Sequence, residues 1–521
     1  MFGRAVRLGA IRRVIASVFL IAAGGLLFAQ ARTADLLEGY LNNSLTVKKL
    51  TLSLKDRMLS RKSTGISNGI AVQLSSGSVV INTAGDGSVS LRPSASVGYP
   101  AARNLKLGVS SNISFADGKN SGSSTSLSLS LDIYSSVMDE RNITLLKADR
   151  SVLEARRSLA DGLVKQEQAF YSELKSLFDA AAKLTSAENT LWEDKLSFRE
   201  LKVKGYEATS LKYRQADTRV RTDEHNVSNY RRDLEKDVKV FARKCGVEYR
   251  ADDPLDWLPV DIPQVEGLDI RSFREEDYSA VESAVWTNRL NTLSRKADKR
   301  FSLAANGGYT FDNSSARGSD TVDGGLDFNM AGGALAAGAG VSVPVTRNSA
   351  GDNSHSPVYT MNLSLNPTKF LTDNIARQQQ GIAEEQELLD IRSARDEWEQ
   401  KVVEKQESLE NLLWNKKGNE ESYELYRSLE ADTLKWYKAG IVNEGEYRTA
   451  LTNMRTYKIQ TIINDLEMLM YNAEVKLLFV RDYELTVLDG KDGAVATGTG
   501  TAAGNGAGGG ASAAGDREGR R

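Results

Sequence analysis

Apolar residues recur every seven positions along two long stretches of the chain. The first series consists of Leu163, Phe170, Leu177, Leu184, Leu191 and Phe198, and after Gly205 a second consists of Tyr213, Val220, Val227, Leu234 and Phe241. A seven-residue apolar period predicts helices that pack as a left-handed coiled coil. Because the two series flank one glycine, they predict an antiparallel helical hairpin over residues 136–248 that turns near Gly205.

The second half of the chain repeats this period with more gaps. Beyond Gly440 the apolar period resumes at Tyr447, Met454, Met468 and Val475. Tyr213-Arg214-Gln215-Ala216 corresponds to Tyr447-Arg448-Thr449-Ala450 at a shift of 234 residues. The chain is therefore predicted to be a duplication, with a second hairpin over 368–482 that turns near Gly440.

Between the helical stretches, apolar residues alternate with small polar ones. Leu127, Leu129 and Leu131 alternate with serines, and the same period of two runs from Tyr359 to Leu365. This alternation predicts strands with one apolar and one polar face over 63–135 and 301–367. It fits a soluble β-sandwich and a transmembrane barrel equally well. Each block could hold four membrane-spanning strands of roughly 10 residues, or two strands with long loops.

All eight prolines lie outside the two helical stretches, which are rich in Leu, Glu, Lys, Arg, Ala and Gln. Proline costs about 3 kcal/mol inside a helix, so its absence there permits long helices. The other segments are predicted to be an N-terminal helix over 32–62, a connector over 249–273, a helix over 274–300 and a disordered Gly/Ala-rich tail over 483–521.

The N-terminus has the three parts of a secretory signal peptide. Four arginines precede an apolar run from Val14 to Phe28, which Ala29-Gln30-Ala31 follows. This pattern predicts removal of residues 1–31. A membrane anchor is the alternative, although the run is shorter than the roughly 20 residues that a helical span needs. No later stretch is apolar for 18 residues, so a mature protein that spans a membrane would do so with strands.

Composition argues against several classes of function. The net charge is −2, which gives no basic field for binding nucleic acid. A single cysteine excludes an intrachain disulfide, and two histidines leave little for a metal site or a histidine relay. An enzyme that uses only carboxylates fits this composition as well, but the shortage of Cys and His favours a protein with no cofactor and no enzymatic activity.

Two segments of the second repeat contain recognisable motifs. The segment from Trp436 to Ala450 contains an aromatic residue, a glycine three residues later and an acidic residue six beyond the glycine, and in the segment from Val358 to Ala383 a proline ends the predicted strand. In these motifs the chain resembles the TolC-like outer-membrane efflux family, in which the first pattern occurs at the tip of the second helical hairpin and the second at the junction of strand and helix. The first repeat departs from both patterns, because Leu131 to Tyr134 lacks the proline and Leu211 takes the acidic position.

The resemblance implies an α+β fold with two repeats, each a block of strands followed by a long antiparallel coiled-coil hairpin. In that family three protomers form one transmembrane β-barrel, which a periplasmic α-helical barrel continues. The resemblance thus implies a homotrimer in outer-membrane lipid that conducts substrates passively, as the channel component of a tripartite efflux or type I secretion system. Its partners would be a periplasmic adaptor (membrane fusion protein) and an inner-membrane transporter.

The resemblance also implies where partners bind and where a gate lies. Adaptor contact would involve the hairpin tips, with Gly205 and Tyr206 in the first and Gly440, Ile441 and Val442 in the second. Glu446 corresponds to the acidic residue that lines the family's aperture, where a ring of carboxylates would select cations. A solvated glutamate that caps the tip helix is the alternative interpretation.

Two other classes of protein fit part of the pattern. One is a non-conducting trimeric surface stalk or adhesin with a β head and a coiled-coil shaft. The other is the periplasmic adaptor itself, which also carries a helical hairpin. Duplicated strand blocks and helices that return on themselves favour the duct over the stalk, and two hairpins rather than one favour it over the adaptor.

Overall fold

The computed structural model describes residues 32–82, 88–116, 119–313, 319–347 and 353–480. These residues belong to one compact unit of the chain. The predicted signal peptide over 1–31 and the predicted tail over 483–521 lie outside the described residues.

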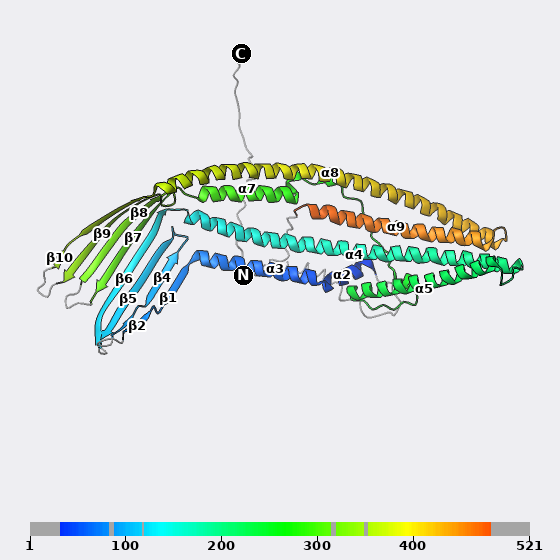
Figure 1. Cartoon of the computed structure of the whole chain (residues 1–521), viewed down its shortest axis with the longest axis horizontal. Coiled ribbons are helices and arrows are strands. Elements are labelled where there is room, and N and C mark those ends of the chain that lie inside the picture. The colour runs from blue at the N-terminus through cyan, green and yellow to red at the C-terminus, as the bar shows by residue number, and fades with distance from the viewer. Residues whose placement is uncertain (1–31, 83–87, 117–118, 314–318, 348–352, 481–521) are drawn as a thin grey trace, which may run out of the picture. The chain divides into compact units, whose positions relative to one another are not determined.

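Four long helices form two antiparallel hairpins. In the first, α4 (Val137–Val203) leads into α5 (Leu211–Cys245), and in the second, α8 (Pro367–Lys438) leads into α9 (Glu444–Leu478). The returning helices α5 and α9 each contain 35 residues. Figure 1 shows the order α5, α4, α9, α8, and the central pair α4 and α9 pack against each other. At 1.5 Å per residue α8 is about 108 Å long.

The seven-residue period predicted from the sequence marks the packed face of the first hairpin. Phe170, Leu184 and Leu234 are at most 1% exposed, and Leu466 of α9 joins the same cluster. Leu163, which the period also includes, is 38% exposed. It lies beyond the end of α5, whose 35 residues reach only about 52 Å from the tip.

The shorter helices line the longer ones. α2 (Thr33–Asn43) packs on α5, α3 (Leu45–Gly69) on α4, and α7 (Ser279–Ala297) on α8. The segment 32–62 is therefore not the single helix that we predicted. Ser44 separates two helices, because its side-chain oxygen accepts the Val47 N–H and caps α3. The connector contains α6 (Pro254–Trp257), a 3₁₀ turn at Ile270–Ser272 and, just beyond it, another at Glu275–Asp277.

The strands within the described residues join one antiparallel sheet at one end of the long helices (Figure 1). The first block contains β1 (Ala71–Ser75), β2 (Val79–Asn82), β3 (Ser88–Leu91), β4 (Ser94–Tyr99), β5 (Leu105–Ala116) and β6 (Lys119–Tyr134). The second contains β7 (Phe301–Asp312), β8 (Ser319–Met330), β9 (Leu335–Arg347), β10 (Asn353–His355) and β11 (Val358–Leu365).

The short strands combine into interrupted rows. β3 and β4 both pair with β5, while β1 pairs with β4 and β2 with β3. Likewise β10 and β11 both pair with β9. The sheet thus has eight rows, in the order β1/β2, β3/β4, β5, β6, β7, β8, β9, β10/β11. Each block contributes four rows, which decides between the two strand counts that the sequence left open.

Candidate functional site

The strand register places apolar residues on one face of the sheet across seven of the eight rows. One line of cross-strand partners consists of Leu74, Ala95, Val109, Leu127, Tyr309, Val322 and Val343. Because successive residues of a strand point to opposite faces, the adjacent line lies on the other face. That line consists of Gln73, Ser96, Gly108, Ser128, Gly308, Asp323 and Ser342. The sheet therefore has an apolar face and a face of small polar residues.

The apolar face remains open to the surroundings. Leu74 is 78% exposed, and Val109, Leu127 and Val322 are each 45–49% exposed. A soluble β-sandwich would bury this face against a second sheet, but the described strands form one sheet. A continuous exposed apolar surface of this kind is typical of contact with a membrane or with another protein.

The polar face carries several carboxylates among its small side chains. Asp327 of β8 accepts a hydrogen bond from the Asn306 side-chain amide at 3.1 Å, and Asp132 of β6 accepts one from Asn104 at 3.1 Å. Asp323 shares the face of Asp327, since the two are four residues apart on one strand. This arrangement can present negative charge to water along the sheet.

Both hairpin tips turn through the same hydrogen-bonded motif. The Gly205 N–H donates to the Lys202 carbonyl and the Tyr206 N–H to the Leu201 carbonyl. At the second tip the Gly440 N–H donates to Tyr437 and the Ile441 N–H to Trp436. These are the paired bonds of a Schellman motif, which requires a left-handed residue after the helix. The φ angles of +74° at Gly205 and +71° at Gly440 meet that requirement.

The predicted tip residues lie together at each turn. Tyr206 is 38% exposed, Ile441 is 72% exposed and Val442 is half-buried. A Cβ built at Gly205 or Gly440 would meet nothing within 4 Å. The glycines are therefore needed for the backbone angle rather than for lack of space.

Glu446 lies in the first turn of α9. The Asn443 side chain caps this helix by accepting the Glu446 N–H at 2.9 Å, so Glu446 is the third helical residue. Its side chain is exposed. A carboxylate at this position is favoured by the partial positive charge of the helix N-terminus. At the first tip Ser210 caps α5 in the same way, but Tyr213 holds the third position.

Aromatic side chains make contacts near both tips, and their partners could not be predicted from the sequence. The rings of Tyr437 and Tyr447 stack with centroids 5.7 Å apart. The Arg448 guanidinium lies 5.1 Å above the Trp192 ring and so connects the second hairpin to the first. The contact therefore joins α9 to α4 within a few helical turns of both tips.

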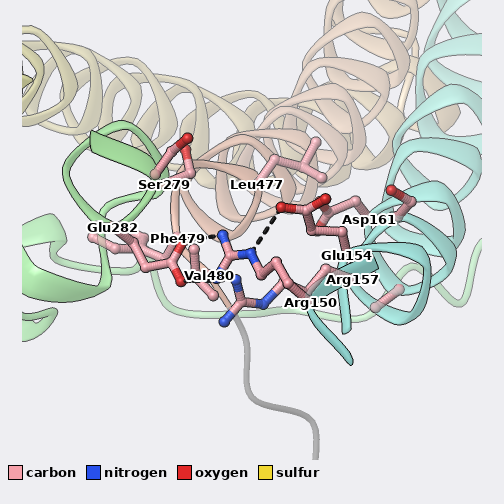
Figure 2. Close-up of a pocket in the computed structure, with 12 residues that line it drawn as sticks. Arg150, Glu154, Arg157, Asp161, Ser279, Glu282, Leu477, Phe479 and Val480 are labelled. Atoms are coloured by element: carbon pink, nitrogen blue, oxygen red, sulfur yellow. Dashed lines mark hydrogen bonds and ion pairs between the residues drawn. The ribbon is translucent and has the colours of Figure 1, made fainter. Parts of the chain in front are cut away.

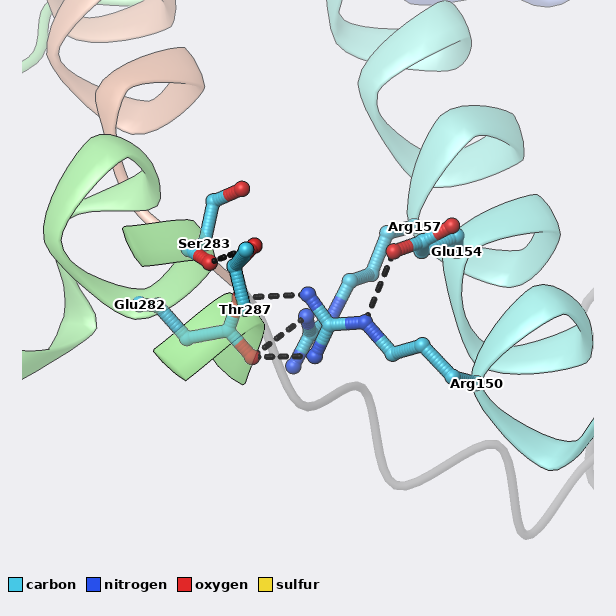
Figure 3. A network of polar contacts seen from close by, with 6 residues as sticks. All are labelled: Arg150, Glu154, Arg157, Glu282, Ser283 and Thr287. Atoms are coloured by element: carbon cyan, nitrogen blue, oxygen red, sulfur yellow. Dashed lines mark hydrogen bonds and ion pairs between the residues drawn. The ribbon is translucent and has the colours of Figure 1, made fainter. Parts of the chain in front are cut away.

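A second polar site, which sequence reasoning missed, joins α4 to α7 (Figure 3). The Arg150 guanidinium donates to both carboxylate oxygens of Glu282, and Arg157 donates to the same carboxylate at 3.1 Å. Arg150 also bonds Glu154 at 2.7 Å and lies 4.8 Å above the Trp286 ring. These residues are far apart in the sequence, so only the tertiary structure brings them together.

The surroundings of this cluster determine its charge state. Burial alone would raise the pKa of Glu282, but hydrogen bonds from Arg150 and Arg157 outweigh it and hold the pKa below its usual value. An open pocket of about 330 Å³ lies beside the cluster, between α4, α7 and the end of α9 (Figure 2). Arg150 and Arg157 come from the first half of the chain and Glu282 from the second, so we interpret the cluster as an ion-pair contact that joins the two halves.

Two further properties concern the described residues only. Within them, no group of three or more His, Cys, Asp or Glu side chains is placed to hold a metal ion.

Among the helices in the described ranges, none is both long enough and apolar enough to cross a membrane.

Two family models match consecutive parts of the chain. The model of the TP096X N-terminal domain matches residues 36–262, and that of the TP096X C-terminal domain matches residues 263–482. The boundary between them falls in the connector that precedes α7. The Arg150–Glu282 cluster therefore joins one domain to the other.

Among curated proteins, an uncharacterized protein of Treponema pallidum (strain Nichols) is 27% identical over 173 residues. That match covers 33% of this chain and 31% of the relative, so the chain spans about a third of the relative's length.

Outer-membrane proteins occur among the similar solved structures. VceC of Vibrio cholerae is 9% identical with a TM-score of 0.44, over 85% of this chain and 94% of VceC. The open outer membrane channel MtrE of Neisseria gonorrhoeae is 12% identical with a TM-score of 0.48, over 85% and 89%. The outer membrane channel CmeC of Campylobacter jejuni is 12% identical with a TM-score of 0.43, over 85% and 84%.

Proposed function

The chain belongs to the TP096X family, and we propose that this member is the outer-membrane channel component of a tripartite efflux or type I secretion system. One observation carries the proposal. The sheet has a continuous exposed apolar face and a polar face of small residues, and it is attached to two long helical hairpins. In this arrangement the apolar face contacts lipid and the polar face lines a water-filled lumen.

A membrane-spanning sheet must leave no edge in lipid, because each unpaired backbone group there costs several kcal/mol. In the described chain the outer rows, β1/β2 and β10/β11, pair on one side only. Neighbouring rows alternate in direction, so the first and the eighth row of one copy run in opposite directions. When identical copies stand side by side, the last row of one is therefore antiparallel to the first row of the next. Identical copies can therefore continue the sheet and close it, and a homotrimer would form a barrel of 24 strands.

The hairpins continue the lumen into the periplasm as a helical barrel. The protein performs no chemistry: it provides a path, while an inner-membrane transporter supplies the energy. The tips, with Gly205 and Tyr206 in one and Gly440, Ile441 and Val442 in the other, dock the periplasmic adaptor. The exposed carboxylate of Glu446 in each copy forms an acidic ring at the aperture.

Two measurements together test this function. The purified protein, reconstituted in a planar bilayer, should conduct ions, and fractionated cells should contain it as a trimer in the outer membrane. If the protein is a trimer in the outer membrane but conducts no ions in the planar bilayer, a surface stalk would be favoured instead. A soluble periplasmic pool would favour the adaptor.

A further inference from the structure

α3 carries an unpartnered apolar stripe. Leu45, Leu52, Leu59 and Ile66 are spaced seven residues apart and are 64–71% exposed. Leu54, two residues or about 200° from Leu52, is 5% exposed and belongs to the face that packs on α4. The stripe therefore faces away from the rest of its own chain.

α8 carries a matching stripe near the sheet. It consists of Leu371, Ile375, Ile382 and Leu389, which are 55–68% exposed. Glu387, two residues or about 200° from Leu389, bonds Asn291 and Arg295 of α7. This second stripe is thus on the face of α8 opposite α7.

The two helices that carry the stripes, α3 and α8, lie at opposite edges of the layer of helices (Figure 1). α3 leads into the edge strand β1, and the edge strand β11 leads into α8. Each apolar stripe therefore continues an unpaired strand edge. On each side of the chain, an exposed apolar helix face continues a strand edge with unpaired backbone groups. Together they indicate one extended contact surface on each side.

The stripes also match in height above the sheet. At 1.5 Å per residue, the stripe residues of α3 lie about 5, 15, 26 and 36 Å from its end at Gly69. Those of α8 lie about 6, 12, 23 and 33 Å from its start at Pro367. All four levels agree within about 3 Å, which is less than one helical turn.

Charge complements the apolar match. Lys48, Lys55 and Lys62 flank the α3 stripe at the same seven-residue spacing and are exposed. On α8 the exposed Glu385 is three residues from Ile382, which places it about 60° around the helix from the stripe. Lysines beside one stripe and a carboxylate beside the other favour contact between the two edges over contact of either edge with its own kind.

We propose that α3 and β1 of one copy pack against β11 and α8 of the next copy, with the two helices antiparallel. The apolar pairs are Ile66 with Leu371, Leu59 with Ile375, Leu52 with Ile382, and Leu45 with Leu389. The contact joins two different surfaces of the chain, so repeating it builds a ring rather than a two-fold dimer. We call this contact between neighbouring copies the seam. It rests on the proposed function only in that the channel assignment sets the number of copies in the ring at three.

The seam is tested by cysteine cross-linking of the full chain in native membranes. The double variant Leu52→Cys/Ile382→Cys should give disulfide-linked dimers and trimers on a non-reducing gel. Native Cys245 is 2% exposed and should contribute little background. The matched control is Leu52→Cys/Gln380→Cys, whose second cysteine is at nearly the same height but about 200° around α8. Absence of cross-links in the first variant, or equal cross-linking in the control, would overturn the seam.

A charge variant gives an independent readout. Leu52→Glu should cause loss of the trimer band on mild-detergent gels, and adding Ile382→Lys should restore part of it. Val203→Glu is the control, since Val203 is 88% exposed at the end of α4 and far from the seam. Unchanged trimer in Leu52→Glu would contradict the seam. Cross-linked trimers that do not conduct ions would support the seam and refute the channel function. Conduction without cross-links would support the channel function and refute the seam.

Discussion

Replacing Glu282 with alanine removes the carboxylate that ties α4 to α7. The variant leaves Arg150 and Arg157, whose side chains are 9% and 15% exposed, without their shared partner. Breaking a buried ion pair costs about 3–5 kcal/mol. Because Glu282 retains 23% exposure and Arg150 keeps Glu154, we expect a smaller loss of about 2–3 kcal/mol in unfolding free energy.

The control is Glu154→Ala, which removes another partner of the same arginine. Glu154 is 57% exposed and lies one turn along α4 from Arg150, so its pair should contribute less than about 0.5 kcal/mol. Thermal unfolding followed by circular dichroism should show a midpoint lower by on the order of 2–3 °C for Glu282→Ala and nearly unchanged for the control.

The pH dependence follows from the lowered pKa of Glu282. A carboxyl whose pKa is lower in the folded state stabilises the fold above its unfolded pKa, and that stability is lost as pH falls through the folded pKa. The difference between wild type and Glu282→Ala should therefore be full at pH 7 and shrink below about pH 4. If wild type and Glu282→Ala unfold at the same midpoint temperature at pH 7, the idea that this cluster holds the two domains together is refuted.

Three further predictions concern the tip, the gate and the N-terminus. Gly440→Val should impair export but not trimer assembly, because a branched residue at φ +71° costs about 1–2 kcal/mol locally; full export in that variant would contradict the tip geometry, and Gly440→Asn should be milder. Glu446→Gln should lower the cation preference measured as a single-channel reversal potential, and Glu446→Lys should shift it towards anions; identical potentials in all three proteins would place the gate elsewhere. Mass mapping of the mature outer-membrane protein should find Arg32 as its first residue, and an intact 1–31 segment in the inner membrane would disprove the signal peptide.

The helical part of the fold was predictable because its signal is local. A seven-residue period identifies the packed face of a hairpin from neighbouring residues alone, and Gly205 and Gly440 mark the turns. Even so, the period extended to Leu163, which is 38% exposed because α5 ends before it reaches that level of α4. The residues around Leu163 do not indicate where α5 ends. The break at Ser44 had a local sign as well, since serine is a common helix cap.

The sheet and the ion cluster depend on contacts between distant residues. Alternation predicted strands and their faces, but not that β3 and β4 form one interrupted row around Pro93, which lacks an N–H to donate. The number of rows in the sheet depends on which strands pair and in what register, and a single sequence does not show this. Arg150 and Glu282 are ordinary surface residue types, and only the packing of α7 beside α4 brings them together.

Adjacent residues on β6 offer the most direct test of the channel. Leu127 belongs to the apolar face and Ser128 to the polar face. In planar bilayers, a charged water-soluble thiol reagent should change the single-channel current of Ser128→Cys and leave that of Leu127→Cys unchanged. A change at Leu127→Cys instead, or no conductance from either protein, would contradict a lumen lined by the polar face of this sheet.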